Sequence, residues 1–434
     1  MNWTPEADEL EKALRARRAP TLFAPDIAEE FVLPAYDGHS LANVGPTVGT
    51  LLGASVPCPS PALAPQYWQG LGDGVQRVIV VVLDALGYLQ LGQILEQQPD
   101  SIWARLARRG ILLPMTSISP STTTTAIATL TTGATPLAHG MLGYELWLRE
   151  YGVLVEMLSV RPVFGVVESL MEWGFVPEAF LARPSLAELW AQEGIRSTAL
   201  VPTKYTRSTL SRTCYRNFTH VLGYTDVADM WSVACHALAD EVGERNAYII
   251  YWAGIDTAIH RHGTGGGFWQ AELQAVAHAF EEQFLSFCSA SPKQGTLLVV
   301  LADHGFVDSP IEAAHDVDTD RTFRRRMLIP FSGESRAAYL HALDAGSERT
   351  LQEVREALGP DYVVHYSQDV IDAGLFGTGE PAPESRARMG HLYVAARGLH
   401  YLDRQSKRYK IRGRHGGLSP EEMLIPWLAV RLDG

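Results

Sequence analysis

The sequence predicts an α/β fold with a doubly wound, mostly parallel central sheet that has helices on both faces, together with a smaller cap insertion. Three apolar runs, at 78–83, 248–252 and 298–302, have the composition of strands that are buried on both faces. Helical and strand-like segments alternate along the chain, as at 186–194 and 195–201. This alternation is typical of parallel sheets with helical crossovers.

The chain divides into stretches of different composition. Residues 1–76 begin with a helical segment at 6–18 and are then rich in Pro and Gly, but they are too apolar for a linker, so we expect an arm that packs on the core. We expect the α/β core at 77–310 and 401–434. Residues 311–400, which hold charged stretches and a Pro- and Gly-rich segment, are expected to form the cap.

Each of the three apolar runs leads to a carboxylate. Asp84 ends the first, Asp256 follows the second, and Asp303 ends the third. If the three carboxylates converge, each pair near 4 Å repels by about 4 kcal/mol at an effective dielectric constant of 20. Bound cations would reverse the sign of this cost. The pattern therefore favours a metal site at the end of the sheet.

Three histidines supply further ligands. His304 follows Asp303 directly, His260 lies four residues after Asp256, and His415 lies in a glycine-rich loop near the end of the chain. Six hard or borderline ligands fit two divalent ions better than one. Taken singly, each piece has a simpler explanation as a turn, a helix cap, an i, i+4 helical pair or a solvated histidine. The conjunction favours the metal site.

A turn rich in hydroxyl residues lies between the first and second of these runs. Segment 117–133 follows strand-like residues 111–115, turns at Pro120 and continues into small residues. Such a turn at a helix N-terminus exposes a hydroxyl to free backbone N–H groups, where an anionic phosphoryl group binds. A metal ion would make that hydroxyl a strong nucleophile. Without the metal ligands, the same residues would indicate an ordinary helix cap.

Taken together and in order, these motifs resemble the alkaline phosphatase superfamily and, within it, the type I phosphodiesterase and nucleotide pyrophosphatase family. The resemblance extends from Asp84 to His415. Its motifs are Pro-x-x-Thr at 120–123, Thr-Gly-x-x-Pro-x-x-His-Gly at 132–140, Asp-x-x-x-His-x-x-Gly at 256–263, Asp-His-Gly at 303–305 and His-Gly at 415–416.

The resemblance implies a covalent mechanism in which Thr123 attacks phosphorus and forms a phosphothreonine, with Thr122 and Thr124 as register alternatives. It also implies two divalent ions, with zinc as the metal. The implied ligands form two sets, Asp84, Thr123, Asp303 and His304 around one ion and Asp256, His260 and His415 around the other. His139 and His262 lie near the motifs but outside the ligand positions, so we expect them to be structural.

The chain departs from the family pattern at Ala126. The family follows its nucleophile with an aromatic residue, Pro and Asn, and the Asn amide helps to hold a phosphoryl oxygen. Ala126 has no such donor, which leaves Thr125 or a backbone N–H as the substitute.

The resemblance implies a two-metal hydrolase of phosphoesters, with phosphodiester or pyrophosphate bonds as the first choice. The alternatives are a phosphomonoesterase or sulfatase on the same fold, or a catalytically silent metal-binding relative. Thr123 lacks the Cys/Ser-x-Pro-x-Arg context of a sulfatase, and a silent relative would be free to lose ligands that are all present here. Segment 117–133 contains no arginine to clamp a monoester dianion, which favours diesters; Arg207, Arg212 and arginines 324–326 are the alternative clamps.

The composition predicts a soluble, cytoplasmic protein, and the resemblance implies that its partner is a small-molecule phosphoester. The net charge is −13, from 36 basic and 49 acidic residues with no sustained basic run, which argues against nucleic-acid or anionic-membrane binding. The four cysteines show no CxxC spacing, and no apolar run reaches membrane-spanning length. Lys204, Tyr205, Arg207 and Arg212 indicate a solvated loop, with anion binding as the alternative.

Overall fold

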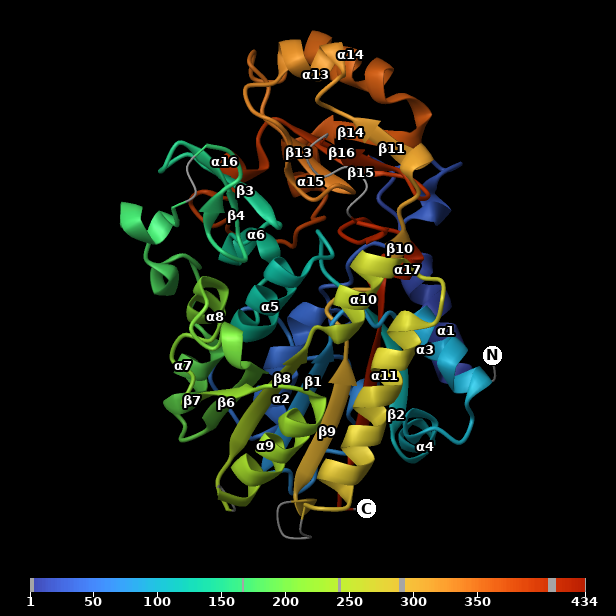
Figure 1. The fold of residues 1–434 in the computed structure, drawn as a ribbon, viewed down its shortest axis with the longest axis vertical. Helices are drawn as coiled ribbons and strands as arrows, with labels where there is room; N and C mark the ends of the chain where they lie inside the picture. Colours follow the sequence, from blue (N-terminus) through green and yellow to red (C-terminus); the bar gives the residue numbers. More distant parts are fainter. Residues whose placement is uncertain (1–3, 166–167, 241–242, 289–292, 405–410, 434) are drawn as a thin grey trace.

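The computed structural model describes residues 4–165, 168–240, 243–288, 293–404 and 411–433, and it contains two large sheets that follow one another along the long axis of the molecule (Figure 1). The larger α/β layer lies in the lower half of the view, and the second sheet lies above it. The carboxyl ends of the central strands of the lower sheet face the second sheet.

The first sheet has seven strands in the order β2-β18-β9-β1-β8-β6-β7. The central pairs β9-β1, β1-β8, β8-β6 and β6-β7 are parallel, whereas β18 runs antiparallel to both of its neighbours. The strands are β1 (Arg77–Leu83), β2 (Ile111–Thr116), β6 (Arg196–Pro202), β7 (His220–Tyr224), β8 (Asn246–Trp252), β9 (Thr296–Leu301) and β18 (Leu424–Arg431). The prediction of a mostly parallel α/β sheet is confirmed.

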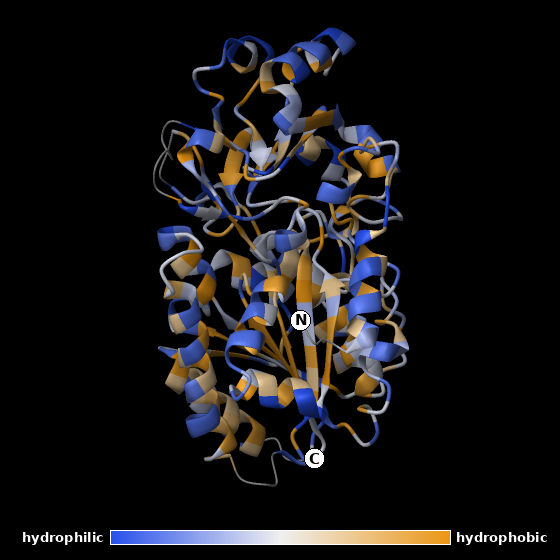
Figure 2. Ribbon diagram, turned by 90° about the vertical axis from the view of Figure 1, so that its right-hand side faces the viewer, coloured by the Kyte–Doolittle hydropathy of each residue, from blue (hydrophilic) through white to orange (hydrophobic). Residues whose placement is uncertain are grey.

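Helices cover both faces of this sheet, and Figure 2 shows its apolar strands between two layers of helices. Because both faces are covered, every residue of β1 and of β9 is buried, and β-branched residues that pack well in strands dominate β1. The helices in this half include α2 (Val44–Leu51), α3 (Tyr88–Gln97), α4 (Ile102–Arg109), α5 (Thr123–Thr132), α7 (Leu186–Ala191), α8 (Thr209–Cys214), α9 (Val227–Asp240), α10 (Gly254–His262) and α11 (Phe268–Ala279).

The second sheet is antiparallel and has the strand order β14-β15-β13-β12-β3-β4-β5. Helices α13 (Arg321–Arg326) and α14 (Glu348–Leu358) lie above it in Figure 1. The strands are β3 (Glu145–Leu148), β4 (Val153–Glu156), β5 (Arg161–Pro162), β12 (Ser332–Gly333), β13 (Ala337–Leu340), β14 (Tyr362–Tyr366) and β15 (Leu392–Ala396).

This sheet draws on more of the chain than residues 311–400, where the sequence analysis expects the cap. Strands β3, β4 and β5 belong to it, and β3 joins β12 through the pair Glu145 and Gly333. The short apolar runs at 146–148 and 153–155 are compatible with strands, but they do not determine which sheet those strands join. The segment that follows the hydroxyl-rich turn at 117–133, here called the nucleophile turn, therefore contributes to the second sheet, here called the cap sheet.

The amino-terminal segment packs against the core close to strand β2. Helix α1 (Pro5–Arg15) opens it, and further along Thr116 of β2 donates its N–H to the His39 carbonyl at 2.8 Å. The Thr116 hydroxyl accepts from the Ala35 N–H at 2.9 Å, and the Val32 N–H donates to the Leu418 carbonyl at 2.8 Å. This segment therefore supports both the end of β2 and the loop after His415. No helix in the part of the chain that the structure describes combines the length and the apolar composition that a membrane span requires.

Candidate metal centre and nucleophile

Asp84, Asp303 and His304 converge where strands β1 and β9 end, and all three residues are buried. Asp84 Oδ1 and Asp303 Oδ2 each lie 3.5 Å from His304 Nε2. Both oxygens are buried and have no hydrogen-bond partner among the described residues. A tetrahedral ion with bonds of about 2.1 Å holds its ligands about 3.4 Å apart. These three atoms therefore have the spacing of ligands to one ion.

Thr123, the first residue of helix α5, adds a hydroxyl to this cluster. Its Oγ1 lies 3.2 Å from His304 Nε2 and 3.4 Å from Asp84 Oδ2. Thr122 is the buried N-cap residue of the helix, and the Thr124 hydroxyl donates to the Gly143 carbonyl at 2.9 Å. Of the three threonines that the sequence leaves open, Thr123 has the hydroxyl that reaches the cluster.

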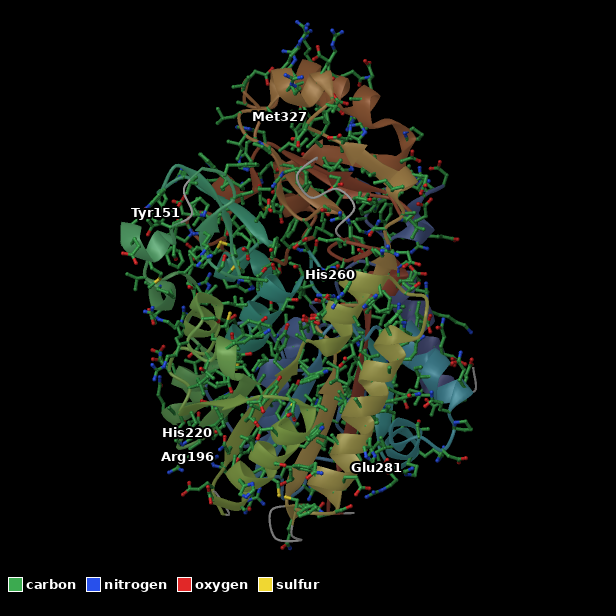
Figure 3. The ribbon with its side chains drawn as sticks, in the orientation of Figure 1. Tyr151, Arg196, His220, His260, Glu281 and Met327 are labelled. Carbon is green, nitrogen blue, oxygen red and sulfur yellow. The ribbon has the colours of Figure 1, made fainter. Side chains whose placement is uncertain are left out.

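Asp256, His260 and His415 form a second cluster beside the first. Asp256 and His260 lie one turn apart on α10, and His260, labelled in Figure 3, lies near the level where the two halves of the molecule meet. Asp256 Oδ1 is 3.2 Å from His260 Nε2 and 3.8 Å from His415 Nε2. The rings of His304 and His415 stack with centroids 3.8 Å apart, so the two clusters adjoin.

The three histidines share one orientation. Nδ1 of His260 lies 2.8 Å from the Gly413 carbonyl, that of His304 lies 3.0 Å from the Gly305 carbonyl, and that of His415 lies 3.1 Å from the Ser121 carbonyl. A carbonyl oxygen only accepts, so in the neutral ring Nδ1 carries the proton and Nε2 carries a lone pair.

Each Nε2 lone pair faces a carboxylate oxygen, which is also an acceptor. Two acceptors that face each other at 3.2–3.8 Å repel unless a cation lies between them. Backbone carbonyls that fix the Nδ1–H tautomer are the usual support of metal-binding histidines. The donor set of both clusters therefore fits divalent metal ions.

The pKa values of Asp84 and His415 also indicate that the clusters suit a bound cation. Burial, followed by the negative charges of Asp303 and Asp256, raises the pKa of Asp84 well above its ordinary value. Burial, followed by the neighbouring His304 and His260, holds the pKa of His415 well below its ordinary value, so its ring is neutral at neutral pH. Divalent ions would relieve the repulsion between the carboxylates and would use the neutral imidazoles as ligands.

A family model described as type I phosphodiesterase / nucleotide pyrophosphatase matches residues 78–418. This chain belongs to that family. The resemblance that the motifs indicate is thus confirmed, and the chain is a hydrolytic enzyme of the phosphodiesterase and pyrophosphatase type. No curated protein sequence matches it.

Solved structures of low sequence identity share the fold. Human ectonucleotide pyrophosphatase/phosphodiesterase 5 is 14% identical with a TM-score of 0.60, and the alignment covers 82% of this chain and 88% of that one. An inactive variant of the murine protein, in complex with AMP, is 15% identical with the same TM-score and coverage. Phosphonoacetate hydrolase from Sinorhizobium meliloti, in complex with phosphonoacetate, is 17% identical with a TM-score of 0.59, covering 81% and 89%.

Tyr251 is a residue of the candidate site that sequence reasoning missed. Its hydroxyl donates to Asp84 Oδ2, and Val82 of β1 pairs with Tyr251 of the adjacent strand β8. Burial and the nearby carboxylates raise the pKa of Tyr251 well above its ordinary value, so the hydroxyl keeps its proton. Because Tyr251 occupies Oδ2, Asp84 Oδ1 is left for an ion. In the sequence, Tyr251 looks like any other aromatic residue of an apolar strand.

The other residues that the sequence singles out lie in ordinary structural surroundings. His139 is fully buried and pairs with the Thr129 hydroxyl at 2.9 Å, and His262 stacks on Phe268 with centroids 3.9 Å apart. Ala126 is buried inside α5, and its N–H donates to the Thr122 carbonyl.

The candidate anion-binding residues are solvated or already paired. Lys204, Tyr205 and Arg207 are exposed. Arg212 binds Glu178 at 2.7 Å, and Arg326 binds Glu353 at 2.5 Å.

Three arginines lie where the cap sheet meets the metal clusters, and each is paired with a carboxylate. Arg404 binds Glu145 at 2.7 Å, and Arg414, next to His415, lies 3.4 Å from Asp403. The third pair, Arg336 and Glu422, is fully buried and bidentate, with distances of 2.7 and 2.9 Å. Glu422 also accepts the Gly417 N–H at 2.8 Å and, through its backbone carbonyl, the Gly305 N–H at 2.8 Å. It therefore supports both histidine-bearing loops.

We expect Glu422→Gln to lower the free energy of unfolding by about 3–5 kcal/mol, because it leaves the buried Arg336 guanidinium without a counterion. Burial alone raises the pKa of Glu422, but Arg336 and the Gly417 N–H outweigh it, so the pKa lies below its ordinary value. The wild type should therefore lose this stabilisation as the pH falls through the lowered pKa, whereas the variant should not. Urea unfolding across the acid range measures both effects.

The matched control is Glu281→Gln, which breaks the partly exposed pair of Glu281 with Arg105. Exposed pairs contribute about 0–1 kcal/mol, so this change should be small. Equal effects of the two substitutions would contradict the role given to Glu422.

Proposed function

We propose that this chain is a two-metal hydrolase of phosphodiester or pyrophosphate bonds in which Thr123 attacks phosphorus and forms a covalent phosphothreonine. The observation that carries the proposal is the set of Nε2 lone pairs that face carboxylate oxygens, with the Thr123 hydroxyl 3.2 Å from one of them. The AMP and phosphonoacetate bound by the solved relatives suggest a small phosphorus-containing substrate.

When bound, two divalent ions, with zinc as the metal that best suits these nitrogen and oxygen donors, would lower the pKa of the Thr123 hydroxyl and offset charge on the phosphoryl oxygens. Asp84, Asp303 and His304 would hold one ion, and Asp256, His260 and His415 would hold the other.

The protein's own groups account for the remaining requirements. The Thr123 hydroxyl donates to Asp84 Oδ2 at 3.4 Å, which directs its proton away from the substrate. Thr123 opens the ten-residue helix α5, whose first N–H groups lie at the positive end of the helix dipole and provide donors for a phosphoryl oxygen. These backbone donors replace the amide that Ala126 lacks. In the first in-line displacement, the Thr123 oxygen would bond to phosphorus as the bond from phosphorus to the leaving alcohol or phosphate breaks. In the second, a water oxygen would bond to phosphorus as the bond to Thr123 breaks, which releases the remaining phosphate ester and restores the hydroxyl.

We expect phosphodiesters to be preferred over phosphomonoesters. A monoester dianion carries an extra charge that needs a cationic clamp, and Arg336, Arg404 and Arg414 are already paired with carboxylates. A hydrogen bond to a charged group contributes about 1.5–3 kcal/mol, so kcat/KM for bis-p-nitrophenyl phosphate should exceed that for p-nitrophenyl phosphate on the order of tenfold or more.

The experiment is a comparison of the two esters at matched pH and zinc concentration, combined with metal analysis of the purified protein. A clear preference for the monoester would move the assignment to a phosphomonoesterase. Fewer than two ions per chain in the fully active protein would contradict the two-metal proposal.

A further inference from the structure

The nucleophile turn and the loop that carries His415 are joined through one buried residue, Ser121. Its hydroxyl donates to the Gly417 carbonyl at 2.8 Å and accepts from the Gly416 N–H at 3.2 Å. Its own carbonyl accepts from Nδ1 of His415 at 3.1 Å. Ser121 has no exposed surface, so water does not compete for these three bonds.

The far side of the same loop is packed closely. Gly416 has a φ of +107°, and a Cβ at this position would lie 2.6 Å from Cβ of Glu334. A Cβ at Gly417 would lie 2.6 Å from the Glu422 carboxylate, which accepts the Gly417 N–H at 2.8 Å. The loop therefore lies between Ser121 on one side and two glutamates on the other, and Ser121 is the contact that ties it to the nucleophile turn.

We infer that Ser121 is a positioning residue, which holds the His415 imidazole at the second cluster and couples that cluster to Thr123, two residues further along the chain. The inference rests on the two-metal function proposed above. Without the Ser121 hydroxyl, the Gly416 N–H and the Gly417 carbonyl lose this partner, and the contact of His415 Nδ1 with the Ser121 carbonyl is what remains of these three bonds to the nucleophile turn. His415 Nε2 then loses its fixed distance from Asp256.

The neighbouring serine provides a matched control. Ser119 lies in the same turn and is equally buried, but its hydroxyl interacts with Tyr393, and no hydrogen bond among the described residues joins it to the His415 loop. Ser119→Ala therefore removes the same atom from the same turn without releasing the His415 loop.

The experiment measures how readily each ion leaves the purified, metal-loaded protein. Wild type, Ser121→Ala, Ser119→Ala and His415→Ala are mixed with increasing concentrations of a chromogenic chelator, and the zinc released is recorded. Loss of a residue that orients a metal ligand typically lowers metal affinity about 10- to 100-fold. In Ser121→Ala we expect that loss of affinity for one of the two ions, whereas the affinity for the other ion should stay within about twofold of the wild type. In Ser119→Ala the affinity for both ions should stay within about twofold of the wild type. His415→Ala should lack the same ion altogether.

A merely structural role would give a different result, in which Ser121→Ala has a lower melting temperature and releases both ions together. That result, or release of both ions as in the wild type, would overturn the inference. Added zinc should also restore turnover of bis-p-nitrophenyl phosphate in Ser121→Ala but not in His415→Ala. If Ser121→Ala does not fold, Ser121→Cys is read in the same way, with a smaller loss because a thiol is a weaker donor and acceptor.

Failure of the inference and failure of the proposed function are distinguishable. A wild-type protein that holds fewer than two ions, or that cleaves no phosphoester, contradicts the function whatever the Ser121 variants do. A wild type with two ions and full turnover, combined with Ser121→Ala that retains both ions equally well, leaves the function in place and removes the role of Ser121.

Discussion

Thr123→Ala is expected to lower kcat for phosphodiester cleavage on the order of 10⁴-fold or more, because removal of a covalent nucleophile removes the reaction path that the rest of the site supports. The metal content should stay close to that of the wild type, because Asp84, Asp303 and His304 would still hold the proposed first ion. In the wild type the Thr123 hydroxyl lies 3.2 Å from His304 Nε2. Thr123→Ser keeps a hydroxyl at this position and should retain part of the activity. Steady-state kinetics and metal analysis of the three proteins test this.

Thr124→Ala is the matched control, since it removes a threonine hydroxyl from the next position of the same helix. That hydroxyl donates to the Gly143 carbonyl, so its loss should affect stability more than turnover. Full activity in Thr123→Ala would sink the covalent mechanism and leave a water molecule held at the metal centre as the nucleophile. Trapping of the p-nitrophenyl phosphoryl group on Thr123 by acid quench and mass spectrometry provides a direct check on the intermediate.

The residues of the two clusters could be predicted from the sequence because their positions follow from local rules. Asp84 and Asp303 each end an apolar run, and the carboxyl ends of adjacent parallel strands β1 and β9 meet at one edge of the sheet. Asp256 and His260 are one helical turn apart on α10. Local sequence therefore predicts both the chemistry and the parts of the fold that position it.

The supporting residues could not be predicted in the same way, because their partners are far away in the sequence. Tyr251 reaches Asp84 across 167 residues, and Ser121 reaches Gly417 across 296. Before folding, nothing distinguishes Tyr251 from a core aromatic or Ser121 from an ordinary turn serine. Only the tertiary arrangement brings them to the ligands, and the same holds for the membership of β3 in the cap sheet.

Asp303→Asn is expected to lose the ion of the first cluster, because an amide is neutral and is a weaker ligand than a carboxylate. Nearly all turnover should be lost with that ion. Asp256→Asn should lose mainly the other ion, since it belongs to the second cluster. Asp308→Asn is the matched control, because Asp308 accepts two hydrogen bonds from Thr264 and belongs to neither cluster. Metal analysis by mass spectrometry should give two ions in the wild type and in Asp308→Asn.

Asp303→Asn should lower the activity but raise the stability of the metal-free protein. After burial, the negative charge of Asp303 is the largest cause of the raised pKa of Asp84, so removal of that charge relieves repulsion inside the closed cluster. We therefore expect metal-free Asp303→Asn to unfold at a higher temperature than the metal-free wild type, with a free energy of unfolding that is larger by on the order of 1 kcal/mol or more. A residue retained for stability would show the reverse. If Asp303→Asn kept both ions and its turnover, or lowered the stability of the metal-free protein, the carboxylates would be structural and the metal centre would be wrong. The expected combination, lower activity with higher metal-free stability, identifies Asp303 as a residue whose electrostatic cost is offset only by a bound cation.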